Sequence, residues 1–298
     1  MVMKKIIFTG SAVALVTPMN QDGSVNYDTL EKLVDFHLQN GTKAIVACAT
    51  TGESPVLSHD EHCSVIETIV KKVNGRVPVI ASSGSNDTRY AAELSKTLQD
   101  CGADALLMIT PYYNKTSQVG FVKHFTYVAD RVNVPIVLYN IPSRTGCDIK
   151  PETYKELAKH PNIVATKEAN GDLAAAARTV ALCGDGLTVY SGEDNLLLPI
   201  LSVGGKGVIS TAANIIPKQM SDICSEYFQG NIEKSRSLFL RYLKLMDSLF
   251  IDVNPMPVKT ALNMMGWSCG ACRLPLVSLN EENAGYLRSV LKEYKLIG

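Results

Sequence analysis

Short apolar runs alternate along this chain with longer stretches in which apolar residues recur every three or four positions. Eight runs have the length and β-branched content of buried strands, at residues 11–16, 44–49, 78–83, 104–109, 135–140, 162–167, 187–192 and 206–210. The stretches between them, such as residues 27–40 and 87–102, have the period of amphipathic helices. The pattern therefore predicts strands and helices in regular alternation.

Eight strand–helix repeats favour a parallel sheet covered by helices, and the number eight favours a closed (β/α)8 TIM barrel over an open sheet. After about residue 215 the strand-like runs stop, and the remaining apolar positions have helical spacing. We therefore expect a catalytic barrel at residues 1–226 and an appended C-terminal α-helical domain at residues 227–298. No glycine-rich linker separates the two parts, which predicts a packed attachment.

The composition narrows the classes of partner. The 298 residues include 29 basic and 29 acidic side chains, so no net charge attracts nucleic acid or a membrane surface. Neither a signal peptide nor an apolar run of membrane-spanning length is present, which predicts a cytoplasmic protein. Eight scattered cysteines then indicate reduced, mostly buried thiols. Cys269 and Cys272 lack a second ligand pair, so we interpret them as structural or incidental.

Polar side chains gather where the predicted strands end, which is the reactive rim of such a barrel. They belong to Thr50, Thr51, Tyr112, Tyr113, Tyr139 and Lys167, and Gly192 lies on the same rim. Because side chains alternate along a strand and adjacent strands lie about 4.8 Å apart, the Tyr139 hydroxyl can come near the Lys167 amine. Glu168 then faces the other way. The alternative is that Lys167 turns outward and pairs with a carboxylate in solvent.

Glycines near two strand ends allow the backbone to approach a ligand. Residues 202–210 lack the order of a P-loop, and no dinucleotide fingerprint occurs in the chain, which argues against nucleotide binding. We expect the glycines in residues 202–210 and at Ser191–Gly192 to let backbone amides approach a small anion such as a carboxylate instead.

Several segments resemble one known group of enzymes. They are ATTGES (49–54), TPYYNK (110–115), YNIPSRTG (139–146), VATKEANGD (164–172), YSGED (190–194), GGKGVIS (204–210) and NPMPVKTALNMMG (254–266). Together they resemble the pyruvate-dependent class I aldolase/lyase superfamily and, within it, the dihydrodipicolinate synthase (4-hydroxy-tetrahydrodipicolinate synthase) family. The resemblance implies a lyase that condenses pyruvate with L-aspartate 4-semialdehyde in the diaminopimelate route to lysine, without metal or cofactor, as a homotetramer built from two dimers.

The resemblance also implies roles for individual residues. Lys167 would form the Schiff base with pyruvate, and Tyr139 would transfer protons through Thr50 to Tyr113, which would serve the neighbouring subunit. Substrate-binding roles would fall to Thr51, Gly192 and Ile209 for pyruvate and to Arg144 for the aldehyde substrate's carboxylate. This chemistry suits the residues, since an amine that condenses with a ketone creates an electron sink, and arginine can bind a carboxylate in bidentate fashion.

The resemblance extends to a possible allosteric lysine site. The matched positions are Ser54, His59, His62, Asn86 and Tyr112. Tyr90 stands where lysine-sensitive members carry glutamate, so an ammonium group would lose a partner there and feedback by lysine is in doubt. Ser143 is a milder departure, because the family commonly has glycine at this position.

Two other functions stay open at this point. One is a related lyase, such as N-acetylneuraminate lyase or a 2-keto-3-deoxy-sugar-acid aldolase, which would keep Lys167 and Tyr139 but take another acceptor. Arg144 argues against it. The other is a barrel that binds a keto acid without catalysis, against which the full set Lys167, Tyr139, Thr50 and Tyr113 argues.

Overall fold

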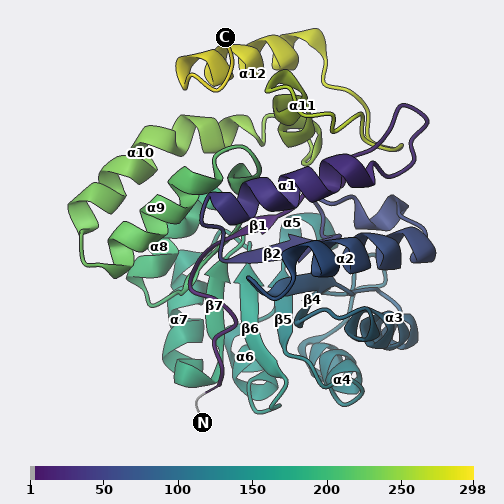
Figure 1. The fold of residues 1–298 in the computed structure, drawn as a ribbon. Coiled ribbons are helices and arrows are strands. Elements are labelled where there is room, and N and C mark those ends of the chain that lie inside the picture. Colours follow the sequence, from purple (N-terminus) through teal and green to yellow (C-terminus); the bar gives the residue numbers. More distant parts are fainter. Residues whose placement is uncertain (1–3) are drawn as a thin grey trace. The chain divides into compact units, whose positions relative to one another are not determined.

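The computed structural model describes residues 4–298 and contains eight strands that pair in the order β1 to β8 and close into a parallel barrel (Figure 1). The strands are β1 (Gly10–Ala14), β2 (Ala44–Ala47), β3 (Val79–Ser82), β4 (Ala105–Ile109), β5 (Ile136–Asn140), β6 (Ile163–Glu168), β7 (Thr188–Ser191) and β8 (Gly207–Ser210). Each overlaps one predicted run, and almost every strand residue is buried, as expected where helices cover a parallel sheet. The prediction of a (β/α)8 barrel is confirmed.

The chain groups into two compact units that each combine distant segments. One unit comprises the N-terminal segment through Gly10 together with Pro78–Ile209, and the other comprises Ser11–Val77 together with Ser210–Gly298. The predicted boundary between residues 226 and 227 lies within helix α9 (Pro217–Phe228) and stays a prediction.

The first unit carries β3 to β7, most of β8 and a series of helices between the strands. These are α3 (Thr88–Asp100), α4 (Gln118–Ala129), the short α5 (Pro142–Thr145), α6 (Pro151–Leu157), α7 (Leu173–Cys183) and α8 (Leu197–Ser202). Helix α3 packs on α4, α4 on α6, and α6 on α7 (Figure 1). The side chains of Asp87, Ser117 and Asp172 accept hydrogen bonds from amides in the first turns of α3, α4 and α7, which fixes where these helices begin.

The second unit carries most of β1, β2 and the remaining helices. These are α1 (Tyr27–Gln39), α2 (His59–Val73), α9, α10 (Ile232–Ser248), α11 (Met256–Met264) and α12 (Glu281–Glu293). Helix α1 packs on α2, α9 on α10, and α11 on α12 (Figure 1). The prediction that the C-terminal part of the chain is helical is confirmed.

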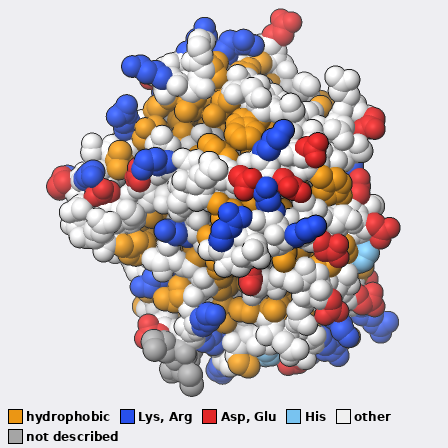
Figure 2. All heavy atoms as spheres, in the orientation of Figure 1, with side chains coloured by type: hydrophobic (Ala, Val, Ile, Leu, Met, Phe, Trp, Pro, Cys, Tyr) orange, Lys and Arg blue, Asp and Glu red, His pale blue; other side chains and the backbone are white. Residues whose placement is uncertain are grey.

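The distribution of surface charges and the burial of the cysteines agree with the expectations from the composition. Basic and acidic side chains are interspersed over the face drawn in Figure 2. The eight cysteines are thiols, and five of them are buried. Within residues 4–298, no helix combines the length and the apolar character that a bilayer span needs. In that same range, no three His, Cys, Asp or Glu side chains are grouped so as to hold a metal ion.

Candidate active site

Lys167 and Tyr139 lie side by side at the ends of β6 and β5. The two residues are direct partners in the parallel pairing of these strands. The Lys167 Nζ atom lies 4.2 Å from the centroid of the Tyr139 ring, and the two residues are only 4% and 5% exposed. Among residues 4–298, no carboxylate forms an ion pair with Lys167. The lysine is therefore buried against an aromatic face, and the alternative of a solvated ion pair is wrong.

Gly192 follows β7 and approaches the stem of Lys167. A Cβ atom at residue 192 would lie 3.1 Å from Cγ of Lys167 and 2.8 Å from Cβ of Ala169. Both distances are shorter than ordinary van der Waals contacts, so only glycine lets the backbone pass this close. The glycine therefore leaves room beside the lysine stem.

The amides of the predicted glycine segments are already used within the fold. Gly192 N donates to Glu168 O at 2.7 Å, which extends the pairing of β6 with β7. Gly204 N and Gly205 N donate to carbonyls of α8 at 3.1 and 2.9 Å. For these three amides the expectation that they face an anion is wrong, because the backbone of the sheet and of the helix end already accepts their hydrogen bonds. A role for Gly192 beside pyruvate stays a prediction.

Glu168, the residue after Lys167, is the centre of a buried cluster of polar groups. As expected, Glu168 points to the opposite side of β6 from Lys167. Its Oε1 atom accepts hydrogen bonds from Asn140 Nδ2 at 2.9 Å and from Asn170 N at 3.1 Å, and its Oε2 atom accepts one from the Tyr154 hydroxyl at 2.9 Å. Burial raises the pKa of Glu168 to about 8. Burial therefore favours the protonated carboxyl group over the carboxylate.

The threonine pair lies in a tight turn after β2, in the second unit. Cys48 and Glu53 flank this turn with left-handed backbone angles φ of 51° and 58°. Thr51 is 2% exposed, and its Oγ1 accepts a hydrogen bond from Asn254 Nδ2 at 3.0 Å. Thr50 is partly exposed. Residues far along the chain thus fix the side chain of Thr51.

A buried ion pair anchors the same turn. Glu53 Oε1 accepts from Lys259 Nζ at 2.7 Å, and Glu53 Oε2 accepts from Arg273 N at 2.8 Å. Lys259 also donates to Ala271 O at 2.8 Å. The two charged side chains are 0% and 2% exposed. Sequence reasoning missed this pair, because nothing in either local pattern reveals a partner 206 residues away.

The remaining predicted residues divide between the units. The first unit contains Lys167, Tyr139, Gly192, Arg144, Tyr113 and Ile209, and the second contains Thr50 and Thr51. Arg144 is exposed on α5, and Ile209 is buried in β8. Tyr113 is 93% exposed and has a left-handed backbone, with φ of 67°. The proton relay from Tyr139 through Thr50 to Tyr113 stays a prediction.

The predicted regulatory residues also belong to both units. In the first unit, Asn86 Nδ2 donates to Tyr112 O at 3.2 Å. In the second unit, Ser54 begins a short 3-10 turn, and His59 and His62 lie on the first turn of α2. A shared site for lysine stays a prediction.

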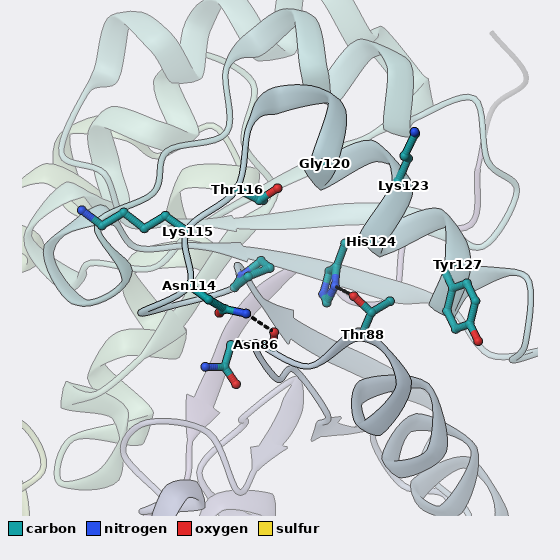
Figure 3. A pocket seen from close by; sticks show the side chains of 10 residues that line it. Asn86, Thr88, Asn114, Lys115, Thr116, Gly120, Lys123, His124 and Tyr127 are labelled. Carbon is teal, nitrogen blue, oxygen red and sulfur yellow. Dashed lines mark hydrogen bonds between the residues drawn. The ribbon is translucent and has the colours of Figure 1, made fainter.

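A cavity of about 350 Å³ in the first unit is distinct from the lysine (Figure 3). It lies between the start of α3, the segment before α4 and α4 itself, and neither Lys167 nor Tyr139 lines it. His124 Nδ1 lies 2.9 Å from Thr88 Oγ1, and burial lowers the pKa of His124 to about 4, so the ring is neutral. Lys115 and Lys123 extend away from each other (Figure 3), so the cavity offers no focused positive charge.

Comparisons with known proteins converge on one group. The model of the Dihydrodipicolinate synthetase family matches residues 7–294. The 4-hydroxy-tetrahydrodipicolinate synthase of Acetivibrio thermocellus is 49% identical over 295 residues, which cover 99% of this chain and 100% of the relative.

Solved structures give the same result. The dihydrodipicolinate synthase of Aquifex aeolicus is 43% identical, with a TM-score of 0.95 over 97% of this chain and 99% of that one. The chloride-inhibited dihydrodipicolinate synthase of Acinetobacter baumannii, solved as a complex with pyruvate, is 43% identical, with a TM-score of 0.96 over 98% of this chain and 100% of that one.

Proposed function

This chain belongs to the dihydrodipicolinate synthetase family, and we propose that it condenses pyruvate with L-aspartate 4-semialdehyde through a Schiff base on Lys167. The enzyme is a lyase of that family. The observation that carries the proposal is the position of Lys167, which is buried at a strand end with its amine over the Tyr139 ring and with Gly192 against its stem.

The first half of the reaction needs an amine and a proton carrier. The neutral Lys167 amine attacks the ketone carbon of pyruvate, and loss of water leaves an iminium ion. The iminium withdraws electrons, so a proton leaves the pyruvate methyl group and an enamine forms. Tyr139 is the phenol nearest the amine and serves as the acid and base for these transfers. Thr50 and Tyr113 extend the proton path.

The second half joins the enamine carbon to the aldehyde carbon of the second substrate. Arg144 is exposed on α5, four residues after Asn140, the last residue of β5. Its planar guanidinium suits the carboxylate of aspartate semialdehyde and would orient the aldehyde for attack. The substrate amino group then displaces Lys167 as the ring closes, which returns the free enzyme.

Borohydride trapping tests the Schiff base directly. Reduction in the presence of pyruvate should leave a stable 1-carboxyethyl group on the Lys167 amine, and peptide mass mapping locates it. Lys167→Arg, which keeps a positive charge but has no competent nucleophile, should gain no adduct at position 167. An adduct on another lysine, or none in the natural protein, would contradict the proposal.

Arg144 provides the test of the acceptor. Arg144→Ala should keep the pyruvate adduct on Lys167 while the condensation with aspartate semialdehyde slows by roughly two orders of magnitude. Cleavage of sialic acid and of 2-keto-3-deoxy sugar acids is measured in parallel. Efficient cleavage of either, with slow condensation, would assign the chain to a related lyase instead.

The proposal includes a homotetramer in which Tyr113 serves the neighbouring subunit. Its 93% exposure leaves the aromatic ring accessible to a second chain, and tyrosine is enriched at interfaces between proteins, which supports a role outside its own chain. Sedimentation of the natural protein should give a tetramer, and Tyr113→Phe should slow turnover more than it changes assembly. An active monomer would contradict this part.

Feedback by lysine is the least supported part. Tyr90 is 44% exposed near the start of α3 and has no carboxylate to offer an ammonium group. We therefore expect weak inhibition by lysine in the condensation assay. Tyr90→Glu should strengthen it if Ser54, His59, His62, Asn86 and Tyr112 form the pocket.

A further inference from the structure

Two neighbouring residue pairs meet at the ends of β5 and β6, one on each side of the sheet. Tyr139 pairs with Lys167, and the following residues, Asn140 and Glu168, pair in the same register. Because side chains alternate along a strand, the first pair carries the proposed chemistry, while the second lies on the opposite side. Asn140 Nδ2 donates to Glu168 Oε1 at 2.9 Å, so a side-chain bond crosses the two strands one residue beyond the reacting pair.

Neighbouring backbone amides and the Asp148 side chain form further hydrogen bonds with Asn140 and Glu168. Asn140 Oδ1 accepts from Ile149 N at 3.1 Å, and Asn140 Nδ2 also reaches Asp148 Oδ1 at 2.9 Å. Asn170 N donates to Glu168 Oε1 at 3.1 Å. The loops that leave β5 and β6 are thus tied to the two side chains, which cannot shift without breaking several buried hydrogen bonds.

We infer that Asn140 and Glu168 are positioning residues that fix the height and register of Lys167 against Tyr139. This inference rests on the proposed function of Lys167. Neither positioning residue touches the substrate; each acts through the strand that carries its neighbour. A sliding or splaying of β5 against β6 would move the amine off the Tyr139 ring, and a displacement of about 1 Å can cost roughly 100-fold in rate.

The hydrogen-bond directions allow a conservative replacement at Glu168. The Tyr154 hydroxyl donates to Glu168 Oε2 and accepts from Thr166 Oγ1 at 3.1 Å. Hydroxyl hydrogens rotate, so this chain can reverse and let Tyr154 accept from the Glu168 side chain. Glutamine can therefore take the place of Glu168, with its carbonyl on Asn140 and its amide on Tyr154.

Quench-flow borohydride trapping of pyruvate on Lys167 measures the rate of imine formation, normalised to folded protein by circular dichroism. Glu168→Leu removes the acceptor from one strand, and Asn140→Ala removes the donor from the other. Each should slow trapping by roughly 10- to 100-fold. Glu168→Gln should stay within about threefold of the natural rate, because it keeps the cross-strand bond.

Tyr154→Phe is the matched control, because it removes one partner of the same carboxyl group but leaves the Asn140–Glu168 bond. It should lower the melting temperature and keep the trapping rate. Natural trapping rates in folded Glu168→Leu or Asn140→Ala would overturn the inference, as would equal slowing in Tyr154→Phe. If Glu168→Leu does not fold, Asn140→Ala and Glu168→Gln decide. Failure to trap pyruvate on Lys167 in the natural protein would instead overturn the proposed function.

Discussion

Glu53 and Glu168 are both buried, and each lies within two residues of a proposed active-site residue, yet different kinds of group form hydrogen bonds to the two carboxyl groups. Glu53 is 2% exposed, and a lysine ammonium and a backbone amide meet its two oxygens. Glu168 is 6% exposed, and its partners are a side-chain amide, a phenol and a backbone amide. One site contains a full positive charge, and the other contains none among the groups that contact it.

The difference teaches that burial alone does not fix the state of a carboxyl group. Without a cation beside it, Glu168 has a pKa raised by desolvation to about 8, so the neutral acid suits its environment. At Glu53, Lys259 supplies the compensating charge directly, and each member of the pair depends on the other. Removal of the neighbouring cation should therefore destabilise the protein at Glu53, where it leaves a buried carboxylate uncompensated. At Glu168, replacement of the carboxyl group by a neutral amide should be tolerated.

The largest effect is expected from Lys259→Met. This change leaves Glu53 buried without its cation and should lower the free energy of unfolding by about 3–5 kcal/mol. Thermal melts and urea unfolding measure the loss. Lys218→Met, at an exposed pair with Asp222 on α9, is the matched control and should cost less than about 1 kcal/mol.

A double variant separates lost charge compensation from lost packing. Glu53→Gln combined with Lys259→Met removes both charges while keeping side chains of similar size. It should recover part of the stability that Lys259→Met alone loses, because no uncompensated carboxylate remains. If the double variant is less stable than the single one, the pair matters for packing or for hydrogen bonds to Ala271 and Arg273 more than for charge.

The contrast also shows which features the sequence could predict. The length and β-branched content of short apolar runs identified all eight strands, and alternation along two of them predicted that Tyr139 and Lys167 share a face. Both are local patterns. The Glu53–Lys259 pair depends on contacts between distant segments that no local pattern encodes. The glycine amides were misjudged because a glycine in the sequence signals close approach but does not say whether its N–H is already bonded.

A second, intermediate effect concerns pH. The pKa of Glu168 is raised from 4.5 to about 8, so between these values the folded protein holds a proton that the unfolded chain releases. This contribution to stability is fully present below about pH 4.5 and is lost as the pH rises through about 8. Glu168→Gln has no such proton. Relative to it, the natural protein should lose up to about 1.4 kcal/mol of stability per pH unit in this window.

Urea unfolding at several pH values between about 5 and 8 measures this divergence. Glu156→Gln removes a carboxylate on α6 that forms an exposed pair with Lys159, and it serves as the control. A divergence of the same size in the control would mean that the effect comes from net charge and not from burial. Parallel curves for Glu168→Gln and the natural protein would contradict the contrast with Glu53.

The smallest effect is expected at Glu61, a third carboxylate, which forms an ion pair with Arg273 close to the solvent. Its side chain is 29% exposed, and the Arg273 guanidinium and the Ser58 amide hold the pKa of Glu61 at about 2. A folded pKa below the unfolded value gives stability that is present above about pH 4.5 and lost as the pH falls toward 2.

Solvent screens such a pair, so Glu61→Gln should lower the free energy of unfolding by less than about 1 kcal/mol at pH 7, and added salt should reduce that loss. Urea unfolding at low and high salt measures it. If Glu61→Gln lowers the free energy of unfolding as much as Lys259→Met does, an ion pair near the solvent would stabilise the protein as much as a buried one. In that case the presence of a neighbouring cation, and not burial, would determine how much a carboxylate contributes to stability.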